Sequence, residues 1–268
     1  MAMAMAAQLL LPAISAGQER AVILAVSEGT SGVIDAADAA LKYAPVAELI
    51  GGVMKRNVTV LAARDFKRLE QSLARQEYDF LLARPSDYPA RAVRDYGYRY
   101  VATATPEGHC AFIASPGSAL SRIEDVKGRS IGLPEKEAYM SRFCTAELRD
   151  RGINVASEKT HYLRDQEALV FSARNGLIDV VGVASYSRAF REWEAGGNPV
   201  LHRSAPQPFM PLVAASRISP AHVQQIQLAL RQASASGTAK GAFLKLGIDT
   251  FTVDTQPQLD ALLIWLSK

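Results

Sequence analysis

Cysteine is scarce in this sequence, with only Cys110 and Cys144 among 268 residues. Two cysteines exclude the disulfide framework that holds small secreted domains together, and no CxxC pair suggests a zinc or redox motif. Three possibilities stay open for them: one disulfide, two buried thiols or a functional thiol.

Catalytic and nucleotide-binding motifs are also missing. The sequence has no HExxH, P-loop or GxGxxG pattern. Charge of one sign is not concentrated either: 30 Lys and Arg face 27 Asp and Glu, for a net charge of +3. Without a basic stripe we expect no nucleic-acid partner, and we expect no enzyme activity.

No apolar run is long enough to cross a membrane, which takes ~20 residues. The longest candidate is the start of the chain, MAMAMAAQLLLPAISAG, which is small, apolar and ends in residues that suit a signal peptidase. We interpret residues 1–18 as the remnant of a signal peptide or a cloning artefact. The mature protein is therefore expected in the periplasm, without membrane insertion.

What the chain does have is a repeated alternation of apolar strand-like runs and helical segments. Strands are expected at 21–26, 58–63, 78–83, 98–105, 110–115, 129–133, 178–183, 199–204 and 212–216. Helices are expected at 35–54 (in two pieces if Pro45 splits it), 65–76, 87–97, 121–128, 135–152, 166–176, 187–197, 220–234 and 257–267.

This order predicts an α/β fold in which mostly parallel sheets are flanked by helices. Proline-containing joints at 105–108 and 204–208 divide the chain. We expect domain one to comprise 19–107 and 205–268, domain two to comprise 108–204, and two hinge crossings to join them. Ligands of such folds bind in the cleft at the carboxyl ends of the strands.

Three segments resemble the periplasmic substrate-binding proteins for phosphonate and phosphite: RDFKRLEQSLARQEYDFLLARPSDY, EDVKGRSIGLP and ARNGLIDVVGV. The resemblance runs from about residue 21 to 235. It implies the two-domain, type II periplasmic binding protein fold. In that family a Ser-Thr-Ser-Gly stretch at a helix N-terminus cradles the phosphonate, but the matching residues here are Glu137, Ala138, Tyr139 and Met140.

Other segments are similar to the arsenite-sensing binding proteins associated with arsenite-oxidase regulation. They are SEGTSG, ARPSDYPAR, GHC and LPEKEAYMSRFCTAELRDRGI. The resemblance implies that Cys110 captures trivalent arsenic through its thiolate, and that the loaded protein signals to a membrane histidine kinase. Sulfur is a soft ligand that suits arsenic, and neutral arsenite needs no positive cradle. A disulfide with Cys144 would remove the thiolate.

Further ligand-binding residues are expected around the cleft, on turns after strands and at one helix start. His109 is a candidate for lowering the thiol pKa. Each of these residues also has a purely structural interpretation, as a cap, turn or salt-bridge residue. The expected set is Cys110, Ser27, Glu28, Thr30, Ser31, Arg84, Ser86, Tyr88, His109, Glu137 and Tyr139.

The leading hypothesis is thus a periplasmic arsenite-binding protein that has no cofactor, closes by hinge motion and signals to a kinase. The alternative is the substrate-binding component of an ABC importer for phosphonate, phosphite or another small oxyanion. An enzyme with Cys110 as nucleophile and His109 as base is disfavoured, because adjacent residues on a strand point to opposite faces.

Overall fold

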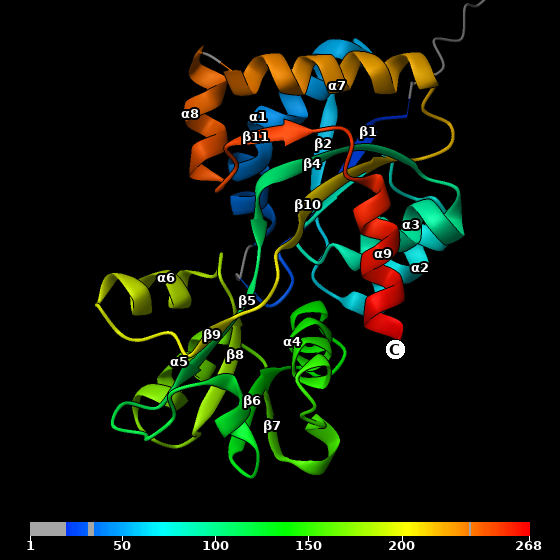
Figure 1. Ribbon diagram of the computed structural model, residues 1–268. Coiled ribbons are helices and arrows are strands. Elements are labelled where there is room, and N and C mark those ends of the chain that lie inside the picture. The colour runs from blue at the N-terminus through cyan, green and yellow to red at the C-terminus, as the bar shows by residue number, and fades with distance from the viewer. Residues whose placement is uncertain (1–19, 32–34, 236) are drawn as a thin grey trace, which may run out of the picture.

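The computed structural model describes residues 20–31, 35–235 and 237–268, which form two α/β domains joined by a narrow waist (Figure 1). Each domain has its own sheet and its own apolar core. The expected signal-peptide remnant at 1–18 lies outside the described residues.

The larger sheet has six strands in the order β11-β4-β10-β3-β1-β2. These strands are Thr250–Thr252, Arg99–Gly108, Gln207–Ala214, Phe80–Ala83, Val22–Ser27 and Val58–Ala62. Strand β1, which lies between β2 and β3, is buried along nearly its whole length, as its continuous apolar run VILAV predicts.

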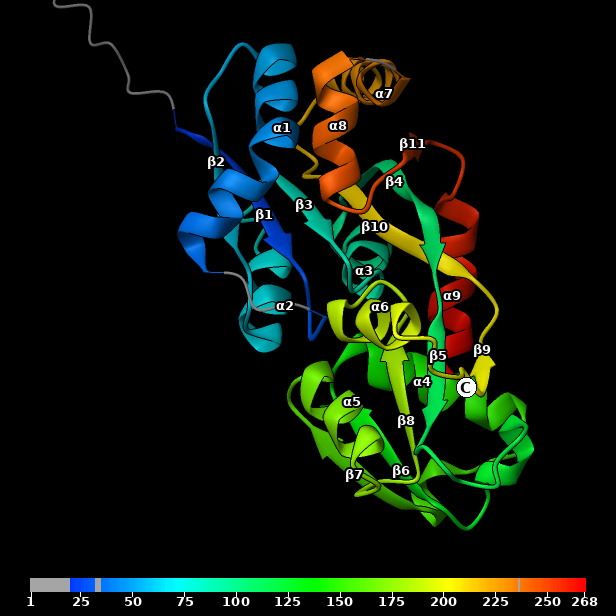
Figure 2. The same cartoon turned by 90° about the vertical axis from the view of Figure 1, so that its left-hand side faces the viewer.

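Helices cover both faces of this sheet (Figures 1 and 2). One face packs against α1, α7 and α8, and the other against α2 and α3. Their bounds are Ala36–Met54, Pro220–Ala235, Gly237–Lys245, Phe66–Ala74 and Asp87–Tyr96. Helix α1 runs through Pro45 without a break, so the expected split is wrong.

The smaller sheet has five strands in the order β7-β6-β8-β5-β9. They are Lys159–Leu163, Ser130–Pro134, Val180–Ala184, Cys110–Ala114 and His202–Arg203. Helix α4 and two short 3-10 helices, η1 and η2, cover one face, and α5 and α6 cover the other. These helices are Tyr139–Asp150, Ile123–Val126, Val155–Ser157, Gln166–Arg174 and Arg188–Ala195.

Both sheets are mixed rather than mostly parallel. β1 pairs in parallel with β2 and β3, whereas β10 runs antiparallel to β3 and β4. In the smaller sheet β5 runs antiparallel to β8 and β9. The chain leaves the larger domain through β4 and β5 and returns to it through β9 and β10. Because these two crossings run in opposite directions, β10 is antiparallel to β4, and β9 is antiparallel to β5.

The C-terminal helix α9 (Gln256–Ser267) contacts both domains. Its Leu259 and Leu263 pack with Tyr100 of the larger domain, and Leu262 joins the core of the smaller one. Trp265 stacks edge-on against Phe143 of α4, at 5.4 Å between ring centroids. The helix therefore braces the waist, which the sequence did not indicate.

Candidate ligand-binding site

A small chamber lies between the two domains, where the loop after β1 faces the start of α4. Its volume is about 10 Å³, roughly the space that one water occupies. The lining residues are Glu28, Gly29, Thr30, Ser31, Phe66, Pro85, Tyr139, Met140, Gln166 and Tyr186. The chamber is therefore too small for a ligand larger than water unless its walls move apart.

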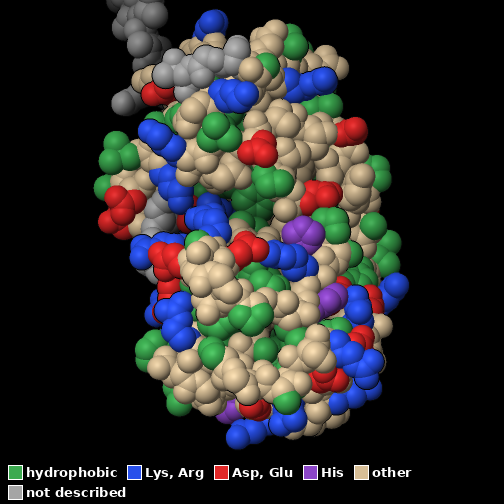
Figure 3. Space-filling model, turned by 60° about the vertical axis from the view of Figure 1, so that its left-hand side comes forward, with side chains coloured by type: hydrophobic (Ala, Val, Ile, Leu, Met, Phe, Trp, Pro, Cys, Tyr) green, Lys and Arg blue, Asp and Glu red, His purple; other side chains and the backbone are tan. Residues whose placement is uncertain are grey.

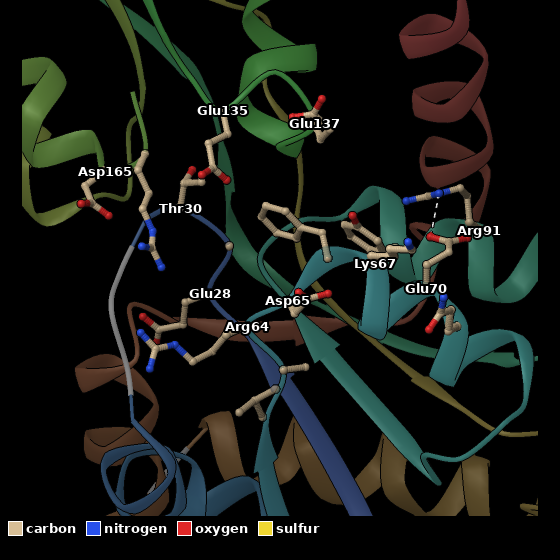
Figure 4. Close-up of a pocket in the computed structure, with 17 residues that line it drawn as sticks. Glu28, Thr30, Arg64, Asp65, Lys67, Glu70, Arg91, Glu135, Glu137 and Asp165 are labelled. Carbon is tan, nitrogen blue, oxygen red and sulfur yellow. Dashed lines mark ion pairs between the residues drawn. The ribbon is translucent and has the colours of Figure 1, made fainter. Parts of the chain in front are cut away.

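A larger vestibule of about 770 Å³ adjoins the chamber and shares Glu28, Gly29, Thr30 and Phe66 with it. Charges of both signs line the vestibule. Figure 4 shows Glu135 and Glu137 on the side of the smaller domain, facing Asp65 and Lys67 on the larger domain. In the space-filling view, charged side chains of both signs surround the hollow between the domains (Figure 3).

The loop after β1 turns sharply to bring its side chains to the chamber. Gly29 has φ +59°, and a Cβ there would lie 2.8 Å from Cγ of Pro85, so only glycine fits. Ser31 Oγ donates to the Glu28 carbonyl at 2.7 Å. This tight turn leaves Thr30 facing the smaller domain.

A buried ion cluster lies behind this loop. Oε1 of Glu28 accepts hydrogen bonds from Lys42 Nζ and from Tyr43 Oη, the latter at 2.8 Å. Oε2 lies 3.4 Å from Nη1 of Arg84. Burial alone raises the pKa of the Glu28 carboxyl, but Arg84, Lys42 and Tyr43 together hold that pKa below its usual range. Glu28 is therefore a carboxylate at neutral pH.

From the smaller domain, α4 directs its N-terminus at the chamber. Ala138 precedes the helix and provides no capping side chain, so the first backbone N–H groups give this end a partial positive charge. Tyr139 and Met140 line the chamber. Burial raises the pKa of the Tyr139 and Tyr186 phenols well above its usual value, so both present neutral hydroxyls.

Gln166 links the two sides. It is buried at the start of α5, where its Oε1 accepts from Ala184 N at 2.8 Å and its Nε2 donates to Thr30 Oγ1 at 3.1 Å. Its position directly after Asp165, where a strand passes into a helix, is the signal that could have identified it.

The two cysteines form a disulfide, with their Cα atoms 5.5 Å apart. Both are fully buried in the core of the smaller domain, and neither lines the chamber or the vestibule. A disulfide sulfur has no thiolate to offer arsenic. The expectation that Cys110 is an arsenic ligand is therefore wrong for this structure, and Cys110 cannot act as a nucleophile either.

His109 lies at the crossing between domains and not at the chamber. Its Nδ1 lies 2.8 Å from the carbonyl oxygen of Ser204, in the other crossing. Its backbone N–H donates to Ser185 Oγ at 3.0 Å. His109 thus ties the two crossings together, and a role in tuning the Cys110 thiol is excluded by the disulfide.

The structure distributes the remaining expected residues in three ways. Glu28, Thr30, Ser31 and Tyr139 line the chamber, whereas Tyr88 and Glu137 line the vestibule. Ser27, Arg84 and Ser86 are buried behind these walls. Ser86 Oγ, for example, donates to the Pro208 carbonyl at 2.6 Å. Sequence reasoning missed Phe66, Gln166 and Tyr186 as lining residues.

Within 20–31, 35–235 and 237–268, no group of three His, Cys, Asp or Glu side chains is placed to hold a metal ion. Over the same ranges no helix has the length and apolar character needed to span a membrane.

Solved structures with the same fold include binding proteins for phosphorus-containing ligands. XAC2383 from Xanthomonas citri bound to ATP superimposes with a TM-score of 0.73, at 15% identity, covering 92% of this chain and 98% of that one. PhnD1 from Prochlorococcus marinus in complex with methylphosphonate gives 0.70, at 10% identity and 91% and 96% coverage. A binding protein component of an ABC phosphonate transporter from Pseudomonas aeruginosa gives 0.69, at 15% identity and 92% and 87% coverage. None of the curated protein sequences matches this chain.

These likenesses confirm the expected fold class, the two-domain type II periplasmic binding protein. A family model described as "ABC transporter, phosphonate, periplasmic substrate-binding protein" matches residues 15–257. Members of such a family bind a small ligand in the periplasm, work with the membrane components of an ABC transporter and are not enzymes. The chain belongs to this family of periplasmic substrate-binding proteins of phosphonate ABC transporters.

Proposed function

We propose that the protein captures a small oxyanion in the chamber between its domains and delivers it to an ABC importer. The observation that carries this proposal is the chamber itself. It lies at the uncapped N-terminus of α4, between two domains that supply opposite walls. A helix N-terminus attracts anions through its free N–H groups and its partial positive charge.

The buried charges behind the chamber favour an anion too. Arg84 and Lys42 each carry a positive charge, and Glu28 offsets one of them. The cluster therefore carries one excess positive charge; the Arg84 side chain is buried, whereas the Lys42 side chain is 34% exposed and is partly screened by solvent. The exposed charges of the vestibule contribute less because solvent screens them.

Neutral donors supply the remaining hydrogen bonds. Thr30, Tyr139 and Tyr186 offer hydroxyls, and Gln166 offers an amide. They take the place of the Ser-Thr-Ser cradle that phosphonate binders carry at the start of the corresponding helix. We therefore propose an oxyanion of the size of phosphite or methylphosphonate, held by a different donor set.

Arsenite capture and signalling to a histidine kinase receive no such support. Thiolate capture requires a reduced Cys110, which the disulfide removes. The family to which the chain belongs serves ABC transporters. Import is accordingly the output that we propose.

The test is calorimetric titration of the oxidised protein with phosphite, methylphosphonate, phosphate and arsenite. We expect saturable binding of at least one phosphorus oxyanion and none of arsenite. The paired variant Cys110→Ser with Cys144→Ser should retain that affinity, because neither cysteine lines the chamber. Met140→Trp should abolish it by filling the chamber.

Two outcomes would contradict the proposal. One is the absence of binding by every phosphorus oxyanion. The other is arsenite binding that appears on reduction and disappears in Cys110→Ser, which would restore the thiol hypothesis.

A further inference from the structure

The carboxylate of Glu28 has unused acceptor capacity beside the chamber. Each carboxylate oxygen offers two lone pairs. Oε1 already accepts from Lys42 and Tyr43, whereas Oε2 has only a long contact of 3.4 Å with Arg84. Glu28 is 6% exposed and is shared between the linings of the chamber and the vestibule. Oε2 can therefore accept one more hydrogen bond, and water has little access to it.

We propose that Glu28 makes the site selective for oxyacids that keep a proton, because its Oε2 accepts a hydrogen bond from a hydroxyl of the bound ligand. Because this selection rests on the proposed function of the chamber, it narrows the ligand class. The class comprises oxyanions that keep at least one O–H group, and it excludes fully ionised oxyanions.

Fully ionised oxyanions are excluded because of charge repulsion and desolvation. A ligand oxygen without a proton would face a buried carboxylate as a second acceptor, and two acceptors with no proton between them repel each other. Burying such a pair also removes part of the hydration that each oxygen had in solution. Sites built to bond a ligand hydroxyl reject analogues that lack it far more strongly than apolar pockets reject a missing methylene.

The neighbouring groups support the same protonation pattern. Arg84, Lys42 and Tyr43 hold Glu28 ionised from the larger domain, so its carboxylate accepts and cannot donate. Tyr139 and Tyr186 line the chamber from the smaller domain, and burial raises the pKa of both phenols, so they stay protonated. Together with Thr30 and Gln166 they donate to the ionised ligand oxygens. The excess positive charge of the cluster matches a single negative charge on the ligand.

Wild-type protein tests this selection with three probes. Sulfate has no proton at neutral pH, methylphosphonate loses its last O–H proton at its second ionisation, and phosphate keeps one O–H after its second ionisation. We expect sulfate to bind at least about 100-fold more weakly than methylphosphonate at low neutral pH. Above its second ionisation, methylphosphonate should lose affinity about tenfold per pH unit, and phosphate should lose less.

The variant Glu28→Gln tests the residue. Its amide can donate to an unprotonated oxygen, so we expect sulfate affinity to rise at least about tenfold and the methylphosphonate pH slope to flatten. Glu192→Gln is the matched control, since this exposed α6 carboxylate pairs only with Arg188 among the described residues. It should leave both properties unchanged.

The possible outcomes distinguish the proposed oxyanion binding from the proposed selection by Glu28. Sulfate binding to wild type within about threefold of methylphosphonate, or a flat methylphosphonate pH profile, overturns the role of Glu28 and leaves oxyanion binding intact. Binding of no oxyanion at any pH overturns the proposed function and this selection with it. If Glu28→Gln does not fold, as judged by circular dichroism, the wild-type pH series decides.

Discussion

The amide nitrogen of Gln166 lies 3.1 Å from the hydroxyl oxygen of Thr30, and this hydrogen bond joins the two domains across the chamber. The same side chain accepts from the backbone N–H of Ala184, so its position is fixed by β8. A side chain fixed in one domain thus contacts the loop of the other at the proposed ligand site.

Replacing Gln166 should weaken ligand capture. Gln166→Ala removes the contact with Thr30 and leaves the Ala184 N–H without its partner, which costs about 1–3 kcal/mol. We expect the affinity for the bound oxyanion to fall about tenfold or more, measured by calorimetry. Gln225→Ala, on the exposed face of α7, is the control; equal loss of affinity in both variants would contradict the assignment.

The disulfide should stabilise the protein without taking part in binding. Cys110 and Cys144 are 34 residues apart in sequence, and a bridge closing such a loop contributes about 2–4 kcal/mol. The Cys110→Ser, Cys144→Ser double variant should lose that amount in urea unfolding. The native wild type should show no free thiol towards a thiol-reactive dye before reduction, and one or two reactive thiols would contradict the bridge.

An ion pair between the domains should favour the closed form even without ligand. Arg142 of α4 donates to the fully buried Asp87 at the start of α3. Arg142→Met should increase the radius of gyration of the ligand-free protein in small-angle X-ray scattering and weaken ligand binding about fivefold. Arg188→Met breaks a surface pair within α6 and should change neither. An unchanged radius for Arg142→Met would mean that the pair does not hold the domains together.

Glu28 should make stability fall in acid. Its folded pKa lies below the unfolded value of 4.5. Its contribution is therefore complete above that value and lost as the pH falls through the lower folded pKa. Unfolding free energies of wild type and Glu28→Gln, measured by urea titration from about pH 6 to about pH 3, should converge at the acid end. A gap that widens there would contradict this sign.

Much of the fold could be predicted from the sequence because local patterns specify it. Apolar runs such as Val22–Ser27 and amphipathic segments such as Phe66–Ala74 place the strands and helices. Helix α8 and strand β11 were missed, because both are short and carry weak periodicity. The antiparallel pairing of β10 was also missed, since the direction of a strand depends on where the chain re-enters the sheet.

The candidate site could be predicted only in part. Turns after strands predicted Glu28, Thr30 and Ser31 as ligand-binding residues, and all three lie on the chamber wall because strand ends converge at one edge of a sheet. Phe66 and Tyr186 escaped notice, since nothing in their local sequence distinguishes an aromatic residue in a cleft from one in a core.

The sequence by itself determined the alternation of strands and helices, the resemblance to a binding-protein family and the residues available for the cleft. Only the tertiary structure decided what the two cysteines do. A cysteine at a strand start is equally compatible with a free thiol and with a bridge, and the difference depends on whether α4 packs its Cys144 against β5. That packing brings two Cα atoms within bridging distance, and it leaves the chamber to Glu28 and a set of neutral donors.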